Sequence, residues 1–157
     1  MLDGKILAIV SPEIEGKTEA GIPFGAESGY SYRSLPKLIM GLYSLPYEVF
    51  EIEDYEARHY AILRISIEQN ITNIATLNPN TIVLLIRKIE KWQGLIIDDI
   101  SLGRLSEKFE ISPDIRAILE RSFKPNPKRA DELKKILKTS GRLLPKDFWP
   151  NMKLIEC

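Results

Sequence analysis

The apolar positions in the first third of the chain predict one buried strand and one short helix. Residues 5–10 (KILAIV) form a continuous apolar run, which is typical of a strand buried on both faces of a sheet. Residues 11–33 are rich in glycine and have no regular apolar period, so we predict a loop there. Helical spacing predicts a short helix over 34–46 that ends before Pro46, and 47–54 is predicted to be extended.

The pattern over 54–69 predicts a longer amphipathic helix, and 70–77 reads as a strand of alternating and β-branched residues. Asp54 is suited to cap the helix at its N-terminus. Arg64 and Glu68, four residues apart, are expected to pair on the polar face. The opposite face collects the apolar and aromatic positions Tyr55, His59, Ile62, Leu63 and Ile67.

A long helix is predicted after the sequence Asn78-Pro79, because asparagine is a good N-cap and proline fits the first helical position. The helix covers residues 81–100, and its first turns are apolar nearly all round, so we expect them to lie deep in the fold. One stripe continues along its length through Ile82, Ile86, Ile89, Gln93, Ile96 and Ile100.

The last third of the chain is predicted to be mostly helical and polar. Helices are expected over 112–123, starting at Ser112, and over 125–141, ending at a glycine. Residues 144–151 are predicted as a turn or short helix, and 152–157 (MKLIEC) as a buried strand.

This order of elements predicts an α/β fold in which helices pack on a partial sheet of buried strands. In open α/β sheets the ligand-binding loops lie just beyond the carboxyl ends of the strands. The last predicted strand ends on the last residue, where such a loop would begin. We therefore expect residues 1–157 to be one α/β piece of a larger domain.

The stretch SPEIEGKT (11–18) resembles a phosphate-binding loop only in its final Gly-Lys-Thr. Its first position holds Ser11 instead of glycine, and the residues after Thr18 contain glycines and a proline that disfavour a helix. Phosphate binding by this motif depends on the N-terminus of that helix. We therefore interpret the stretch as a surface loop.

Composition excludes several classes of partner. The 22 basic residues balance the 22 acidic residues, which gives no support for binding nucleic acid or an anionic membrane. No apolar run is long enough to span a bilayer, and the N-terminus does not have the pattern of a signal peptide. One cysteine and one histidine cannot build a closed zinc site, so no metal site is expected and a cytoplasmic location is the default.

Four stretches follow one another in the chain: KTEAGIPFGAESGYSYR, ATLNPNTIVLLIRKIEK, ISLGRLS and LLPKDFWPNMKLIEC. Together they resemble the Gretchen Hagen type acyl-acid–amido synthetases, the auxin-responsive family of adenylate-forming ligases. The resemblance covers most of residues 16–157. The resemblance implies an internal part of the large N-terminal domain.

The resemblance also implies a reaction, in which ATP and Mg²⁺ activate a small carboxylic acid as its adenylate and the acyl group then passes to an amine. The nucleotide-binding motifs of the family have no counterpart in this sequence, so no cofactor is expected to bind here and the isolated chain is expected to be inactive. The resemblance therefore implies that this chain carries part of the wall of the acyl-acid pocket and not the nucleotide site.

By analogy with the family, the turn Thr76-Leu77-Asn78 borders the acid pocket, and Tyr60, Leu63 and Arg64 lie on a helix that forms another wall. Each has a competing structural interpretation. Asn78 can be a simple N-cap, and Arg64 can pair with Glu68 instead of meeting a carboxylate.

Two other reactive side chains are not expected to be catalytic. His59 has no carboxylate or serine partner at helical spacing, so a packed histidine is expected. Cys157, a terminal thiol with no histidine near it in the sequence, is not expected to be a nucleophile.

Two alternatives to the amide-forming ligase stay open. One is a stand-alone α/β interaction module without catalysis, and the other is part of a relative that transfers the acyl group to coenzyme A. Unpaired strand edges would also favour self-association of the chain.

Overall fold

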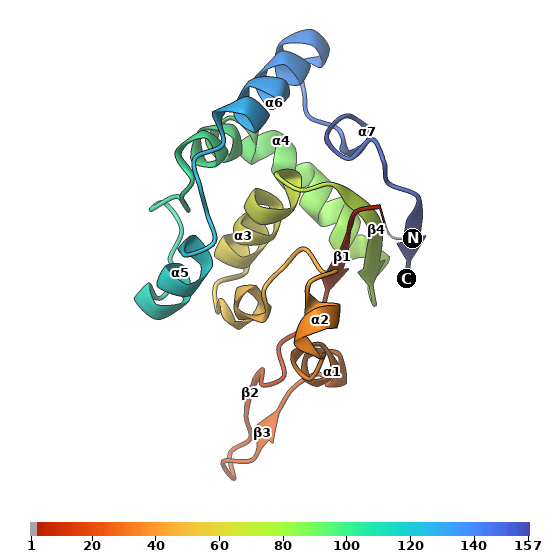
Figure 1. Cartoon of the computed structure of the whole chain (residues 1–157). Coiled ribbons are helices and arrows are strands. Elements are labelled where there is room, and N and C mark those ends of the chain that lie inside the picture. The colour runs from red at the N-terminus through yellow and green to blue at the C-terminus, as the bar shows by residue number, and fades with distance from the viewer. Residues whose placement is uncertain (1–2) are drawn as a thin grey trace.

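The computed structural model describes residues 3–157 and has the expected mixed α/β architecture (Figure 1). Its helices are seven α-helices and one short 3₁₀ segment, η1, within the described residues. In chain order the elements are β1 (Lys5–Ile9), β2 (Gly16–Lys17), β3 (Pro23–Phe24), α1 (Glu27–Arg33), α2 (Lys37–Met40), η1 (Tyr47–Glu51), α3 (Tyr55–Ile67), β4 (Ile71–Thr76), α4 (Pro79–Leu102), α5 (Pro113–Glu120), α6 (Pro127–Ser140), α7 (Pro145–Phe148) and β5 (Leu154–Glu156).

The main sheet has the strand order β1-β4-β5, and all its strands run parallel. Leu7 is in register with Ile74, and Ile74 is in register with Ile155, so these side chains share one face. Leu63 of α3 and Leu85 of α4 pack against that face. The sheet and these two helices enclose the hydrophobic core, and α6 packs on the outer side of α4 (Figure 1).

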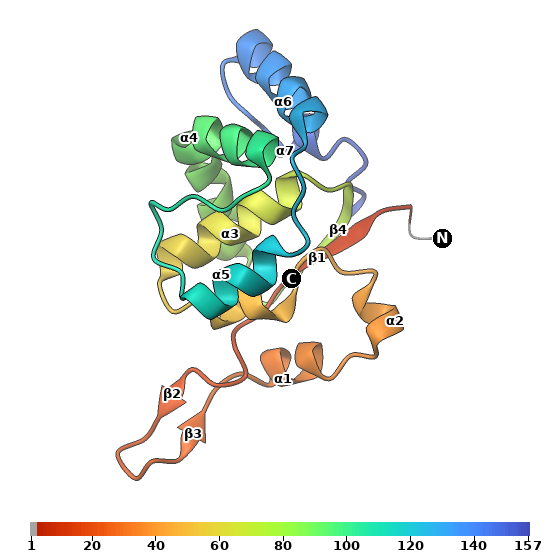
Figure 2. The same ribbon diagram turned by 60° about the vertical axis from the view of Figure 1, so that its left-hand side comes forward.

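The prediction of a loop throughout 11–33 is wrong in two places. A small antiparallel hairpin, β2–β3, projects from the body of the molecule, and α1 follows it (Figure 2). Gly29 of α1 lies so close to the preceding segment that an added Cβ would sit 2.4 Å from the backbone oxygen of Ser11. Glycine there serves close packing of one backbone on another, a need that the local pattern does not reveal.

The next segments are also more compact than predicted. The helix expected over 34–46 is limited to the short α2, and the stretch expected to be extended forms η1. Tyr47 and Phe50, three residues apart, are both buried, and their rings meet edge to face with centroids 6.3 Å apart. A 3₁₀ turn places residues at this spacing on the same side, so tertiary packing decides the conformation.

The predicted helix caps are confirmed. The side chains of Asp54, Asn78 and Ser112 accept hydrogen bonds from backbone N–H groups in the first turns of α3, α4 and α5. The C-terminal glycine of α6, Gly141, has φ 75°. The long helix α4 ends in the same way at Gly103, with φ 67°.

Two predictions of deep burial are wrong. Val83 and Leu84, in the first turns of α4, are exposed, and β5 is a strand whose residues are all exposed. Among the described residues β5 is an edge strand, with no further strand beyond it. In the part of the chain that the structure describes, no helix has both the length and the apolar character needed to cross a membrane.

The segment before β5 is fixed by side chains of the Trp-Pro-Asn sequence. The indole N–H of Trp149 donates to the carbonyl of Ser66 at 3.0 Å, and the Asn151 amide donates to the side chain of Asn70 at 3.0 Å. The backbone N–H of Lys153 then donates to the carbonyl of Thr72 at 2.8 Å. These contacts set the register of β5 on β4 and give the motif a structural role.

Candidate functional site

A cavity of about 240 Å³ lies at the carboxyl ends of all three parallel strands. Its lining is mainly apolar and small: Ala8, Ile9, Val10, Ser28, Ala75, Thr76, Leu77, Glu156 and Cys157. This is the edge of an open parallel sheet where ligands bind, because the loops that follow the strands converge there. The lining suits the apolar part of a small ligand, with a few polar groups at the rim.

The turn between β4 and α4 supplies the predicted residues of this cavity. Thr76 and Leu77 both line it, and Leu77 is 80% exposed. The hydroxyl of Thr76 donates to the carbonyl of Asn78 at 3.3 Å and accepts from its N–H at 3.4 Å. The side-chain oxygen of Asn78 accepts from the N–H of Asn80 at 2.9 Å, so this oxygen is used in capping α4.

Ser28 of α1 is a polar lining residue that the sequence analysis missed. Its hydroxyl oxygen is shielded from solvent and has no hydrogen-bond partner among the described residues. Leaving a buried hydroxyl unpaired costs roughly 1–3 kcal/mol, which a ligand or a bound water can recover. The sequence does not reveal it, because the residues of α1 have no regular apolar period.

Leu63 lies one layer deeper than the turn. It lines a narrow apolar crevice of about 50 Å³ between the sheet and α4, together with Ile74 and Leu85. Ile9 lines both the crevice and the larger cavity, so the two are neighbours. Leu63 therefore supports the wall of the cavity without lining it.

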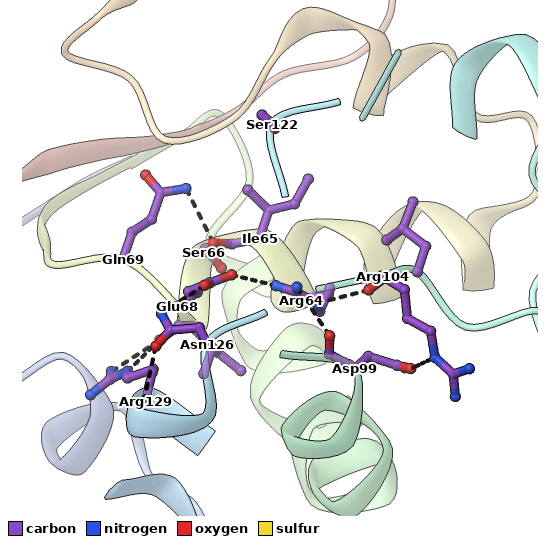
Figure 3. Close-up of polar contacts among 12 residues, drawn as sticks. Arg64, Ile65, Ser66, Glu68, Gln69, Asp99, Arg104, Ser122, Asn126 and Arg129 are labelled. Atoms are coloured by element: carbon purple, nitrogen blue, oxygen red, sulfur yellow. Dashed lines mark hydrogen bonds and ion pairs between the residues drawn. The ribbon is translucent and has the colours of Figure 1, made fainter. Parts of the chain in front are cut away.

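Tyr60 and Arg64 are not brought to this cavity. Both are fully buried. Figure 3 shows Arg64 in a polar cluster between α3, α4 and the segment that leads to α6. The guanidinium of Arg64 donates to the Glu68 carboxylate at 2.6 Å and to the carbonyls of Asp99 at 3.2 Å and Arg104 at 3.1 Å. The predicted Arg64–Glu68 pair is thereby confirmed, and a role of Arg64 in acid binding stays a prediction.

The tyrosine is held by the same cluster. Its hydroxyl donates to the Asp99 carboxylate at 2.7 Å and accepts from the backbone N–H of Ser106 at 2.8 Å. Burial, together with the hydrogen bond to Asp99, raises the pKa of Tyr60 above its ordinary value. The hydroxyl therefore stays protonated and serves as a donor inside the fold.

His59 packs between α3 and α4 and has a basic neighbour. Its Nδ1 lies 2.9 Å from the ammonium group of Lys88, which also pairs with Glu56. Burial, and then the positive charge of Lys88, lowers the pKa of His59 below its usual value. The imidazole is therefore a neutral acceptor in a structural contact, which matches the expected packed histidine.

The Gly-Lys-Thr sequence is part of the hairpin and does not cradle a phosphate. The backbone N–H of Glu15 donates to the carbonyl of Phe24 at 2.8 Å, and that of Thr18 to the carbonyl of Ile22 at 2.9 Å. A wider groove of about 660 Å³ runs between this segment and the start of α3. Across residues 3–157, no three metal-ligating side chains come together as a candidate ion site.

Comparison with known families identifies the class of protein. The sequence of residues 1–157 matches the profile of the GH3 family N-terminal domain. The chain therefore belongs to the GH3 family.

Solved structures of this family share the fold. One match is titled GH3.15 acyl acid amido synthetase, with a TM-score of 0.77 and 21% identity over 98% of this chain and 28% of that chain. Another is AtGH3.15 acyl acid amido synthetase in complex with 2,4-DB, with a TM-score of 0.68 and 20% identity over 98% of this chain and 27% of that chain. The chain thus spans little more than a quarter of these structures, and no curated protein matches it.

Proposed function

We propose that residues 1–157 contribute part of the acid-binding wall of an ATP-dependent acyl-acid ligase, within a larger acyl-adenylating domain. The observation that carries this proposal is the cavity at the carboxyl edge of the parallel sheet, lined by Thr76 and Leu77. It lies in a chain of the GH3 family, and the solved structures with the same fold are titled acyl acid amido synthetases. One of those proteins is in complex with 2,4-DB, which is therefore a suitable probe.

The chemistry that the cavity supports is the binding and orientation of an organic acid. Ala8, Ala75 and Leu77 offer apolar contacts to the body of the acid. Ser28 and Thr76 offer hydroxyl groups, and that of Ser28 is free to bond a polar atom of the ligand. In the ligase reaction, the carboxylate oxygen would bond to the α-phosphorus of ATP with release of pyrophosphate, and an amine would then displace AMP to form the amide. The residues of this cavity would hold and orient the acid.

The Gly-Lys-Thr segment is not proposed as a phosphate-binding site for ATP. The backbone N–H groups of Glu15 and Thr18, beside and within the Gly-Lys-Thr sequence, are used in the hairpin. We therefore assign nucleotide and metal binding to other parts of the GH3 fold, and calorimetry with ATP is expected to show no binding to this chain.

Ligand-detected NMR with 2,4-DB tests the proposed acid site. Saturation transfer from the chain to the 2,4-DB protons is expected, and an Ala75→Trp variant, which fills the cavity, is expected to abolish it. Ala20→Trp, in the exposed turn of the hairpin, is the matched control and should keep the transfer. Equal transfer in both variants would place the acid elsewhere, and a melting temperature for each variant checks that it is folded.

A further inference from the structure

The polar side chains that line the carboxyl-edge cavity differ in what they can still bond. They are Ser28, Thr76, Glu156 and Cys157. The Thr76 hydroxyl is already used, because it donates to the carbonyl of Asn78 and accepts from its N–H. Glu156 and Cys157 are exposed, so they can bond to water. Of these side chains, only the Ser28 hydroxyl is both shielded from solvent and without a hydrogen-bond partner.

The position of Ser28 is fixed by the packing of α1 against the segment that follows β1. The N–H of Ala26, the N-cap residue of α1, donates to the carbonyl of Pro12 at 3.2 Å. Gly29, next to Ser28, approaches Ser11 too closely to leave room for a Cβ. The hydroxyl itself can turn among the staggered χ1 positions. The backbone therefore holds Ser28 at the cavity before a ligand binds, which lowers the entropy cost of a hydrogen bond there.

The cavity suits Ser28 to the body of an acid and not to its carboxylate. None of the residues that line the cavity is basic, and Glu156 carries the same charge as the acid. Burying a carboxylate there would cost free energy that no ion pair returns. In the proposed reaction the carboxylate also has to stay open to the α-phosphorus of ATP. A neutral hydroxyl, in a lining that includes Ala8, Val10 and Ala75, instead matches a neutral acceptor atom.

We propose that Ser28 selects acids that carry an uncharged oxygen atom in their apolar body, such as an ether or carbonyl oxygen, over hydrocarbon acids of the same shape. This inference rests on the proposed acid site. The Ser28 hydroxyl donates to that oxygen, while the apolar lining contacts the rest of the acid. An acid without the oxygen leaves the hydroxyl unpaired, and a site discriminates against a ligand in this way.

Titration with a matched pair of acids tests this selection. One is 2,4-DB, a dichlorophenoxybutanoic acid with an ether oxygen, and the other is its analogue with a methylene group in place of that oxygen. Each is added to the isotope-labelled chain and followed by amide shifts. The quantity of interest is the ratio of the two dissociation constants, because the difference in hydration between the acids is the same for every variant. Ser28→Ala is expected to reduce the preference for 2,4-DB about fivefold, the size of one net hydrogen bond.

Two further variants serve as controls. Ser31→Ala changes an exposed serine of α1 that does not line the cavity, so it should leave the ratio unchanged. Ser28→Thr keeps the hydroxyl and should keep the preference for 2,4-DB, even if the added methyl group weakens both acids.

An unchanged ratio in Ser28→Ala would overturn the inference. Equal weakening of both acids would assign Ser28 to the carboxylate, and no weakening of either would show that the hydroxyl does not contact the acid. Both results leave the proposed acid site intact, because both acids still bind the parent chain at the cavity. Failure of both acids to bind the parent chain there would overturn the proposed function together with this inference.

Discussion

The charged side chain of Arg64 is wholly buried, and its hydrogen bonds compensate for the loss of water. Its donors reach the Glu68 carboxylate and two backbone carbonyls, and its guanidinium lies 4.6 Å from the centroid of the Phe123 ring. The Glu68 carboxylate is bonded in turn by the amide of Asn126 at 2.8 Å. Figure 3 shows that this cluster joins α3 to the end of α4 and to the start of α6. Its polar groups are paired, so it fixes the helix layer that supports the sheet.

Replacing this arginine is expected to destabilise the chain strongly. Arg64→Ala leaves the partly buried Glu68 and two carbonyls without their donor, which is expected to lower the free energy of unfolding by about 3 kcal/mol. Arg87→Ala, on the exposed side of α4, is the control and should change it by less than about 0.5 kcal/mol. Urea denaturation measures both, and a small effect of Arg64→Ala would show that the cluster is dispensable.

His59 is expected to make stability depend on pH. Burial and Lys88 lower its pKa in the folded chain, whereas the unfolded chain titrates near the ordinary value of 6.5. The unfolded state therefore binds more protons below that pH, and the free energy of unfolding should fall as the pH drops from about 7 to 5. The charged groups facing the imidazole are Lys88, Glu56, Arg58 and Asp54.

A His59→Gln variant isolates this contribution. Glutamine cannot titrate, so the variant is expected to lose less stability than the parent chain over the same pH range. Thermal unfolding at a series of pH values gives both slopes. Identical slopes would show that His59 titrates alike in the folded and unfolded states.

At the scale of whole elements, the residues at the end of a helix determine its terminal backbone conformation. The packing around that end depends on segments far away in the sequence. Gly103 and Gly141 end α4 and α6 in the same left-handed conformation. An added Cβ at Gly103 would lie 2.5 Å from the backbone of Lys124 and Pro125, whereas nothing lies within 4 Å of one at Gly141. The first glycine therefore serves both conformation and packing, and the second serves conformation alone.

These two glycines give a matched pair of substitutions. Gly141→Ala is expected to cost about 1 kcal/mol, because only the left-handed backbone opposes it. Gly103→Ala should cost a further 1–3 kcal/mol, roughly, because the segment before α6 must also shift. Chemical denaturation compares the two, and equal losses would contradict the close packing at Gly103.

The same contrast explains which features could be predicted from the sequence. Asp54, Asn78 and Ser112 act within one turn of their own helix, so their pattern was sufficient. The hairpin is held by backbone bonds between residues several positions apart, such as that from Glu15 to Phe24, and its two-residue strands leave no periodic signal. The exposure of β5 depends on which strands lie beside it, and the sequence of β5 alone does not determine those neighbours.

The sequence predicts only those residues of the candidate site whose position follows from local structure. Thr76 and Leu77 follow a recognisable strand and precede a capped helix, so their place at the carboxyl edge could be expected. Ser28 reaches the cavity only because α1 folds back on the segment after β1, where Gly29 allows the close approach. Tyr60 and Arg64 share the helix of Leu63, but their side chains enter the polar cluster behind it.

At the scale of the whole molecule, the chain is a section of the GH3 fold with a well-packed side and an open side. The packed side contains the helices α3, α4 and α6 and the polar cluster. The open side contains β5 and the first turns of α4, with the carboxyl-edge cavity beside them. The proposed acid site therefore lies beside the exposed strand β5.

The measurement that tests the proposed function most directly is a titration of the isotope-labelled chain with 2,4-DB, followed by amide chemical shifts. We predict saturable shifts centred on Ser28, Ala75, Thr76 and Leu77, with the groove beside Glu15 and Arg58 unaffected. Shifts centred on that groove, or no saturable shifts at all, would contradict an acid-binding wall at the carboxyl edge of the sheet.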